Sequence, residues 1–91
     1  MIIAHRCKAD LQKRSAYIQL ALPAIEKGDE KILASSNDIV AKENGVKEQT
    51  VLIEFDSFDL AVAAYESEPY QAALRALGDG ADRDVRIFEG L

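Results

Sequence analysis

Residues 50–55, Thr-Val-Leu-Ile-Glu-Phe, predict the clearest strand of the chain, because β-branched and aromatic residues favour strands. Alternation divides its side chains between two faces, with Val51, Ile53 and Phe55 on one and Leu52 and Glu54 on the other. Asp56 and Ser57 follow directly, and both residue types cap helices by accepting hydrogen bonds from the first turn. A strand that passes straight into a capped helix is therefore the unit around which the rest of the chain can be ordered.

The chain after this unit predicts two helical segments and a closing strand. The first helix has Leu60, Ala63 and Ala64 on its inner side. Residues 67–69, Ser-Glu-Pro, start a second helical segment, since proline is tolerated in the first helical turn. The apolar residues of this segment recur at i, i+3, i+4 and i+7, and Gly78 ends it: Tyr70, Ala73, Leu74 and Leu77. Residues 84–89 predict the last strand.

The chain begins with a short apolar run that predicts another strand, over residues 1–6. Alternation would place Ile3, His5 and Cys7 on one face of it. Asp10 is then expected to cap a helix by accepting hydrogen bonds from its first backbone N–H groups. The first strand and the first helix are thus joined by a very short connection.

A helical period extends over residues 11–27. Its apolar stripe, with Tyr17 on the flank, consists of Leu11, Ile18, Ala21, Leu22 and Ile25. Pro23 lies inside this pattern and predicts a kink or a helix restart, because proline lacks the N–H that the helix needs. Gly28 and Asp29 are expected to end the helix.

Residues 32–35 predict a second strand, and residues 39–41 are expected to resume its pairing. Asn44 and Gly45 form a strong turn signal, since both tolerate positive φ. The resulting order is β-α-β-β-α-β, which is the α+β, ferredoxin-like arrangement with a four-stranded antiparallel sheet. We expect residues 1–91 to form a single domain of this kind.

The helices of a ferredoxin-like domain lie on one face of its sheet, so the other face needs a cover. A second copy of the chain is the simplest cover, and a domain of 91 residues gains from burying more apolar surface. The sequence therefore predicts a homodimer that forms through the open sheet face.

Charge and cysteine content restrict the partners and the location. The net charge is −5, and an acidic body repels phosphate backbones, so we expect no nucleic acid partner. Residues 1–27 are the exception, with five basic and two acidic side chains. This end could attract a small anion, face an acidic partner surface, or be an ordinary solvated face, which is the plainest reading. The single cysteine excludes an intramolecular disulfide and favours the cytoplasm.

Neither a membrane segment nor a secretion signal is expected from the sequence. No stretch approaches the ~20 apolar residues that a membrane helix needs. The N-terminal apolar run becomes charged within six residues, and it lacks the longer apolar region of a signal peptide. We therefore expect no membrane partner.

The run VLIEFDSFDLAVAAYESEPYQAALRALGDGADRDVRIFEG, residues 51–90, resembles the closing half of domain of unknown function family 1330. The resemblance is carried by Ile53-Glu54-Phe55, Ser57, Ala61 to Tyr65, Ser67, Tyr70-Gln71-Ala72, Ala81, Arg83-Asp84 and Glu89-Gly90. It implies a dimeric α+β barrel but no agreed activity.

The chain departs from the family pattern at two places. Ser67-Glu68-Pro69-Tyr70 stands where the family commonly has Ser-Pro-Glu-Tyr. Ala34-Ser35-Ser36-Asn37 stands where it often has an Arg-Gly-Gly run. If that arginine binds an anion in relatives, this chain lacks it, which weakens any ligand transferred from the resemblance.

Five side chains are candidates for a ligand site: His5, Tyr17, Glu54, Tyr65 and Tyr70. The tyrosines could offer hydroxyl groups to an organic ligand, although helix-phase aromatics more often fill a core. Glu54 could act as an acid or base if its face is covered, or pair with Arg6 or Arg86 on neighbouring strands.

Two reactive roles can also be considered for His5, in a nucleophilic pair and in a metal site. A nucleophilic pair with Cys7 would need a base in reach and an oxyanion site, so a structural role is the plainer reading. A metal site from His5, Cys7 and Asp10 would need ligands that the chain does not offer, since it has no other histidine or cysteine. We expect no metal and no cofactor.

Three functions stay open at this point. The first is a homodimeric binder of a small organic molecule. The second is a cofactor-independent isomerase or monooxygenase-like enzyme, and the third is a purely structural or regulatory module. A cavity that contains His or Tyr groups would favour the first two, whereas a packed interior would favour the third.

Overall fold

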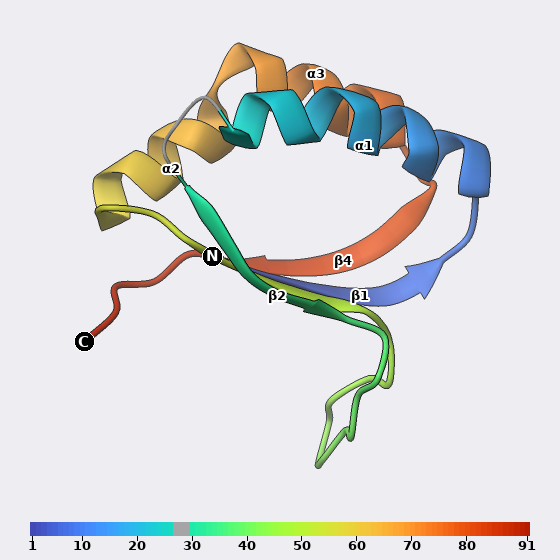
Figure 1. The fold of residues 1–91 in the computed structure, drawn as a ribbon. Coiled ribbons are helices and arrows are strands. Elements are labelled where there is room, and N and C mark those ends of the chain that lie inside the picture. Colours follow the sequence, from blue (N-terminus) through green and yellow to red (C-terminus); the bar gives the residue numbers. More distant parts are fainter. Residues whose placement is uncertain (27–29) are drawn as a thin grey trace.

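Four strands form one antiparallel sheet, and the helices lie together on one side of it (Figure 1). The computed structural model describes residues 1–26 and 30–91. The elements in chain order are β1 (Ile2–Lys8), α1 (Leu11–Glu26), β2 (Lys31–Ser36), β3 (Thr50–Glu54), α2 (Phe58–Glu66), α3 (Glu68–Leu77) and β4 (Ala81–Arg86). The strands lie in the order β2-β3-β1-β4 across the sheet. This confirms the predicted ferredoxin-like α+β arrangement, with its second helical region divided into α2 and α3.

Side-chain caps define the helices of the second half. The Ser57 hydroxyl accepts a hydrogen bond from the Leu60 N–H at 3.1 Å, and α2 begins there. Ser67 has extended backbone between the two helices, and its hydroxyl accepts from the Tyr70 N–H at 3.4 Å. Gly78 ends α3 with a φ of 51°, a left-handed value that glycine adopts without strain. The predicted start of α2, restart at α3 and stop at Gly78 are therefore confirmed. The predicted inner side of α2 was wrong for Leu60 and Ala63, which are exposed, because the helix turns Ala61 toward the core instead.

Helix α1 differs from its prediction in two respects. The Asp10 carboxylate accepts a hydrogen bond from the Lys13 N–H at 3.0 Å, as expected of a cap. However, α1 runs through Pro23 as one helix, so the predicted helix restart at Pro23 was wrong. Of its predicted apolar stripe only Ala21 and Ile25 are buried. The other members, Leu11, Ile18 and Leu22, are exposed. The predicted end at residues 28–29 lies outside the described part of the chain.

Pairing with β1 places the last strand earlier than predicted. Strand β4 pairs along β1 from Lys8↔Ala81 to Ile2↔Arg86, which uses the whole length of β1. Residues 87–89 therefore extend past the paired part of β1, and the prediction of a strand over 84–89 was three residues late.

The segment between β2 and β3 is a long loop rather than a continued strand. Residues 39–41 do not pair, contrary to expectation. The loop turns where the Gly45 N–H donates to the Lys42 carbonyl at 2.9 Å. Glu43 has the positive φ in this turn, at 54°, so the turn lies one residue before the predicted Asn44-Gly45 pair. In Figure 1 the loop projects away from the sheet on the side opposite the helices.

Two register shifts change which side chains face the helices. In β1 the register shifts between His5 and Cys7, so His5 pairs with Arg83 while Cys7 pairs with Asp82. Cys7 therefore lies on the face opposite to His5, and the prediction that they share a face was wrong. In β2 the shift between Ile32 and Ala34 brings both Ile32 and Ser35 to the helix side.

The core lies between the helix layer and the sheet. Its buried members are Met1, Ile3, Ala21, Ile25, Ile53, Tyr70 and Ala73. The opposite sheet face carries the alternate side chains, and the register groups Ile2 with Leu52 and Arg86 in one row there and Ala4 with Thr50 and Asp84 in the next. None of the helices covers this second face (Figure 1).

Candidate functional site

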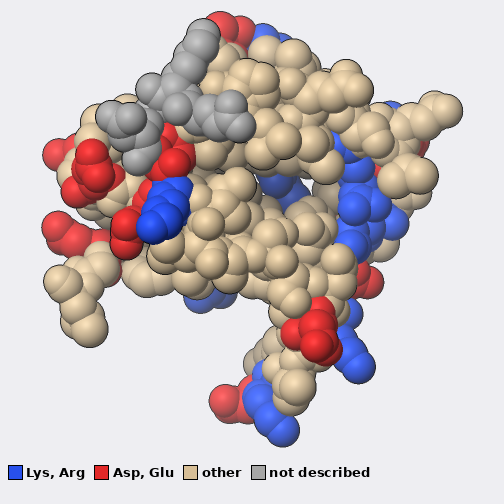
Figure 2. All heavy atoms as spheres, viewed as in Figure 1, with Lys and Arg blue, Asp and Glu red and all other residues tan. Residues whose placement is uncertain are grey.

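A cavity of about 190 Å³ lies between α1 and the sheet. Figure 2 shows the molecule hollowed at this place, with Lys or Arg atoms visible inside the hollow. Most of the wall is apolar and comes from α1 and the three strands β1, β2 and β3: Ile3, Ile18, Ala21, Leu22, Ile25, Ile32, Val51 and Ile53. Ile18 and Leu22, two of the three exposed members of the predicted α1 stripe, thus face this cavity.

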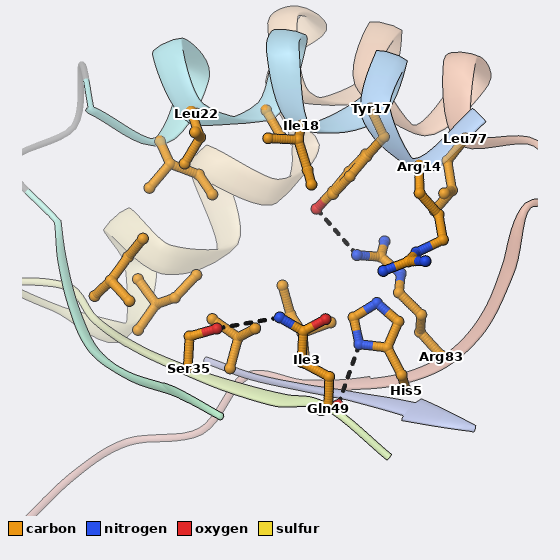
Figure 3. Close-up of a pocket in the computed structure, with 15 residues that line it drawn as sticks. Ile3, His5, Arg14, Tyr17, Ile18, Leu22, Ser35, Gln49, Leu77 and Arg83 are labelled. Atoms are coloured by element: carbon orange, nitrogen blue, oxygen red, sulfur yellow. Dashed lines mark hydrogen bonds between the residues drawn. The ribbon is translucent and has the colours of Figure 1, made fainter. Parts of the chain in front are cut away.

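Polar side chains gather at one end of this cavity (Figure 3). Arg14 reaches down from α1, and Arg83 reaches up from β4 toward Tyr17. His5 and Gln49 lie below them on the sheet side. Among residues 1–26 and 30–91, no aspartate or glutamate lines the cavity. Two guanidinium groups therefore share one end of a mostly apolar space without a carboxylate in its described wall.

Arg83 is held in place by Tyr17. Its Nη1 donates to the Tyr17 hydroxyl at 3.0 Å, and its Cζ lies 4.7 Å from the centre of the Tyr17 ring. The Tyr17 and Tyr70 oxygens are 2.6 Å apart and share a hydrogen bond. Burial, with Tyr17 next in effect, raises the pKa of Tyr70 well above its ordinary value, so this hydroxyl stays protonated. One hydrogen bond to Tyr17 leaves further guanidinium N–H groups of Arg83 for a ligand.

His5 lies on the sheet directly below the arginines, and its surroundings favour the neutral imidazole. Its Nδ1 is 3.2 Å from the Gln49 carbonyl oxygen. Burial lowers the pKa of His5 below its ordinary 6.5, and the positive charges of Arg83, Lys8 and Arg14 lower it further, against the hydrogen bond to Gln49, which raises it. The Gln49 side chain in turn donates to the Ser35 hydroxyl at 3.2 Å. The polar end thus combines two hydrogen-bonded sets, Arg83 with Tyr17 and His5 with Gln49 and Ser35, and its groups come from β1, α1, β2, the loop before β3, and β4.

The structure brings only some of the predicted site residues to this cavity. His5 and Tyr17 line it. Tyr70 lies behind Tyr17 and is 1% exposed, and the Tyr65 ring packs against it with centroids 5.2 Å apart. Glu54 lies on the other face of the sheet, in a wider groove of about 630 Å³ that the C-terminal residues help to form. Neither Tyr65 nor Glu54 is among the residues that line the cavity.

Ion pairs elsewhere bear on the pairing considered for Glu54. Arg86 pairs with Asp84 at 3.1 Å rather than with Glu54. Arg75 pairs with Glu68 at the start of its own helix.

Four cavity residues were not proposed from sequence: Arg14, Ser35, Gln49 and Arg83. One signal for Arg14 was present, namely the basic character of residues 1–27 in an acidic protein. Ser35 belongs to the segment that replaces the family's Arg-Gly-Gly run. The cavity therefore has a serine from that segment, and its two arginines come from α1 and β4 instead.

A family model described as "Domain of unknown function (DUF1330)" matches residues 1–91. The chain belongs to this family. The match also covers the first half of the chain, outside residues 51–90 on which the resemblance was based. A search of curated proteins finds no match.

Two solved structures of a Rhodopseudomonas palustris protein share the fold of this DUF1330 chain. One is described as the crystal structure of the RPA0582 protein of unknown function, with a TM-score of 0.74, 13% identity, and coverage of 99% of this chain and 79% of that one. The other is methylated RPA0582, with a TM-score of 0.69, 13% identity, and coverage of 99% and 78%. At this identity the likeness establishes the fold alone, and no activity comes with it.

The chemistry available in the cavity is that of anion binding in an apolar setting. Arginine presents a planar fork of donors that matches a carboxylate, and the apolar wall suits a hydrocarbon group. Within residues 1–26 and 30–91 no three His, Cys, Asp or Glu side chains gather as a metal site. The same residues include no helix long and apolar enough to cross a membrane.

Proposed function

We propose that this DUF1330 protein binds a small organic carboxylate that has a short apolar tail. The observation that carries the proposal is the pair Arg14 and Arg83 at the polar end of a mostly apolar cavity, in whose described wall there is no carboxylate. Two cations held together in a partly dry space repel each other, and an anion relieves this repulsion while its tail removes apolar wall from water. The proposal develops the small anion considered for the basic N-terminal region, to which Arg14 belongs.

The cavity volume sets the size of the ligand. At about 190 Å³ it is smaller than most drug-sized ligand pockets. A dry protein cavity of about 150 Å³ holds one benzene molecule, so the space suits a single ring or a chain of roughly six carbons. Hexanoate and benzoate have the right size and charge and serve as probes.

The other functions considered from sequence are less well supported. A purely structural module would have a packed interior, and this domain instead has a hollow beside His5 and Tyr17. For an enzyme, His5 is the titratable group in the cavity, but neighbouring arginines oppose the positive charge that a general base must take up. Binding therefore accounts for the site better than acid–base catalysis does.

Affinity for hexanoate, measured by calorimetry, tests the proposal. Hexanoate is expected to bind at least about tenfold more tightly than hexanamide, since charge-assisted hydrogen bonds contribute about 1.5–3 kcal/mol. Arg14→Met should remove most of this difference. Arg75→Met removes the same charge from an exposed ion pair on α3 and should change neither affinity. Equal binding of acid and amide, or an equal loss in both variants, would contradict the proposal.

We also propose that a second copy of the chain covers the open sheet face. Ile2 and Leu52 lie in one row of that face, and Leu33 is 48% exposed in the adjoining groove. Exposed apolar side chains of the C-terminal residues, Phe88 and Leu91, border the same groove. Packing two such faces would remove these groups from water, and the arrangement is the dimeric barrel that the family resemblance implies. The cytoplasmic location stays a prediction that rests on one free, exposed cysteine, Cys7.

Light scattering on a sizing column tests the dimer. The parent protein is expected to elute as a dimer at micromolar concentration, and Leu52→Arg as a monomer, because it places a charge in the centre of the buried face. Leu60→Arg makes the same change at an exposed position of α2 and should stay dimeric. A monomeric parent would end this proposal without affecting the carboxylate site.

A further inference from the structure

His5 has one ring nitrogen whose proton can be assigned from its partner. The Gln49 carbonyl oxygen, 3.2 Å from Nδ1, can only accept a hydrogen bond, so Nδ1 carries the hydrogen. The same carbonyl also accepts from the His5 backbone N–H at 2.9 Å, which fixes the residue on both its backbone and its ring. In a neutral imidazole with hydrogen on Nδ1, Nε2 is a bare acceptor.

Nε2 is directed toward the polar end of the cavity. Figure 3 shows the ring with Nδ1 on the Gln49 side and its other nitrogen toward Arg14 and Arg83. No hydrogen bond to Nε2 occurs among the residues that the structure describes. Around the ring stand Gln49 from the β2–β3 loop, Lys8 from β1, Arg14 from α1 and Arg83 from β4. The charged groups among them are all cations, and each disfavours a proton on Nε2.

We infer that the carboxylate ligand carries a hydroxyl group close to its carboxylate, and that this hydroxyl donates to His5 Nε2. The inference rests on the proposed function and names the ligand class as short-chain hydroxy carboxylates. The arginines supply only donors, which suit the carboxylate, whereas His5 supplies only an acceptor. A ligand with an anion alone would leave this partly buried acceptor without a partner, and such unmet groups cost affinity.

The role of His5 here is that of an acceptor and not of a base. An imidazolium would form beside Arg14 and Arg83, and like charges at short range oppose it. The hydroxyl of a hydroxy carboxylate keeps its proton while it donates, so no positive charge develops on the ring. The site therefore selects its ligand by a neutral hydrogen bond beside a charged one.

Four probes of equal chain length test this inference by calorimetry at pH 7.5: hexanoate, 2-hydroxyhexanoate, 3-hydroxyhexanoate and 2-methoxyhexanoate. One of the two hydroxy acids is expected to bind about fivefold more tightly than hexanoate, the usual gain from one neutral hydrogen bond. The 2-methoxy acid has no donor and should show no gain over hexanoate. This comparison uses the parent protein alone and needs no variant.

Variants of His5 identify the acceptor. In His5→Phe, which keeps a ring and removes the acceptor, the hydroxy acid should lose its advantage over hexanoate, and a cooperative thermal unfolding transition shows that the variant is folded. Three results would overturn the inference: a hydroxyl preference that persists in His5→Phe, tighter binding of the 2-methoxy acid than of hexanoate, or no gain for either hydroxy acid. In each case hexanoate binding to the parent protein would still support the proposed function. Failure of all four acids to bind the parent overturns both.

Discussion

The Tyr70→Ala variant is expected to lose about 3–5 kcal/mol of its free energy of unfolding, the range typical of deleting a buried aromatic ring. Tyr70 is the largest fully buried side chain among the described residues. Its ring meets Tyr17 edge to face with centroids 6.0 Å apart and packs against Tyr65 on another side. Removing it leaves a hole between α1 and α3 and frees the Tyr17 hydroxyl that positions Arg83.

Chemical denaturation of two further variants separates the ring from its hydroxyl. Tyr70→Phe keeps the ring and is expected to lose about 1 kcal/mol, since it removes only the hydrogen bond to Tyr17. Tyr65→Phe serves as the control for removing a tyrosine hydroxyl beside the same cluster and should stay within about 0.5 kcal/mol of the parent. A Tyr70→Ala variant as stable as Tyr65→Phe would show that this cluster does not hold the helix layer together.

The Ala21→Leu variant is expected to lower hexanoate affinity by about 50-fold. Ala21 is 2% exposed and forms part of the cavity wall in the middle of α1. A leucine there would occupy the space of about three methylene groups of the ligand, each contributing about 0.8 kcal/mol of transfer free energy. Because the new side chain enters a hollow, stability should fall by less than about 1 kcal/mol.

The matched substitution Ala63→Leu controls for the added bulk. Ala63 is exposed on α2, away from the cavity, and the change should alter neither binding nor stability by a measurable amount. Unchanged hexanoate affinity in Ala21→Leu would show that the ligand binds elsewhere. A large loss of stability in Ala21→Leu would show that the wall cannot accept a larger side chain, and hence that the hollow is not available to a ligand.

Local signals were enough to predict the order of the helices and strands, but not the register in which the strands pair. Ser57, Ser67 and Gly78 act through their immediate neighbours, and each behaves as its residue type indicates. The limits of β4 and the face on which Cys7 lies depend on the register with β1. A register shift of one residue moves a side chain to the other face of the sheet, and no residue type within β1 predicts such a shift. Helix α1 likewise continues through Pro23, against the local preference of proline.

The cavity was harder to predict than the fold because its residues come from distant parts of the chain. Arg14 and Arg83 are separated by almost the whole domain, and only the β1–β4 pairing and the placement of α1 bring them together. In the sequence Arg83 stands between Asp82 and Asp84, which gives no sign that it faces a cavity. Tyr17 and Tyr65 were both proposed because a tyrosine hydroxyl can bind an organic ligand, but only Tyr17 lines the cavity.

The most direct test of the carboxylate site is a crystal structure with 6-bromohexanoate, in which anomalous scattering marks the apolar end of the ligand. We expect the carboxylate between Arg14 and Arg83, and the bromine peak about one chain length away beside Ile18 and Val51. A bromine peak in the groove beside Phe58 and Leu91, or no peak in the cavity at a ligand concentration that saturates binding in solution, would contradict the assignment of this cavity as the binding site.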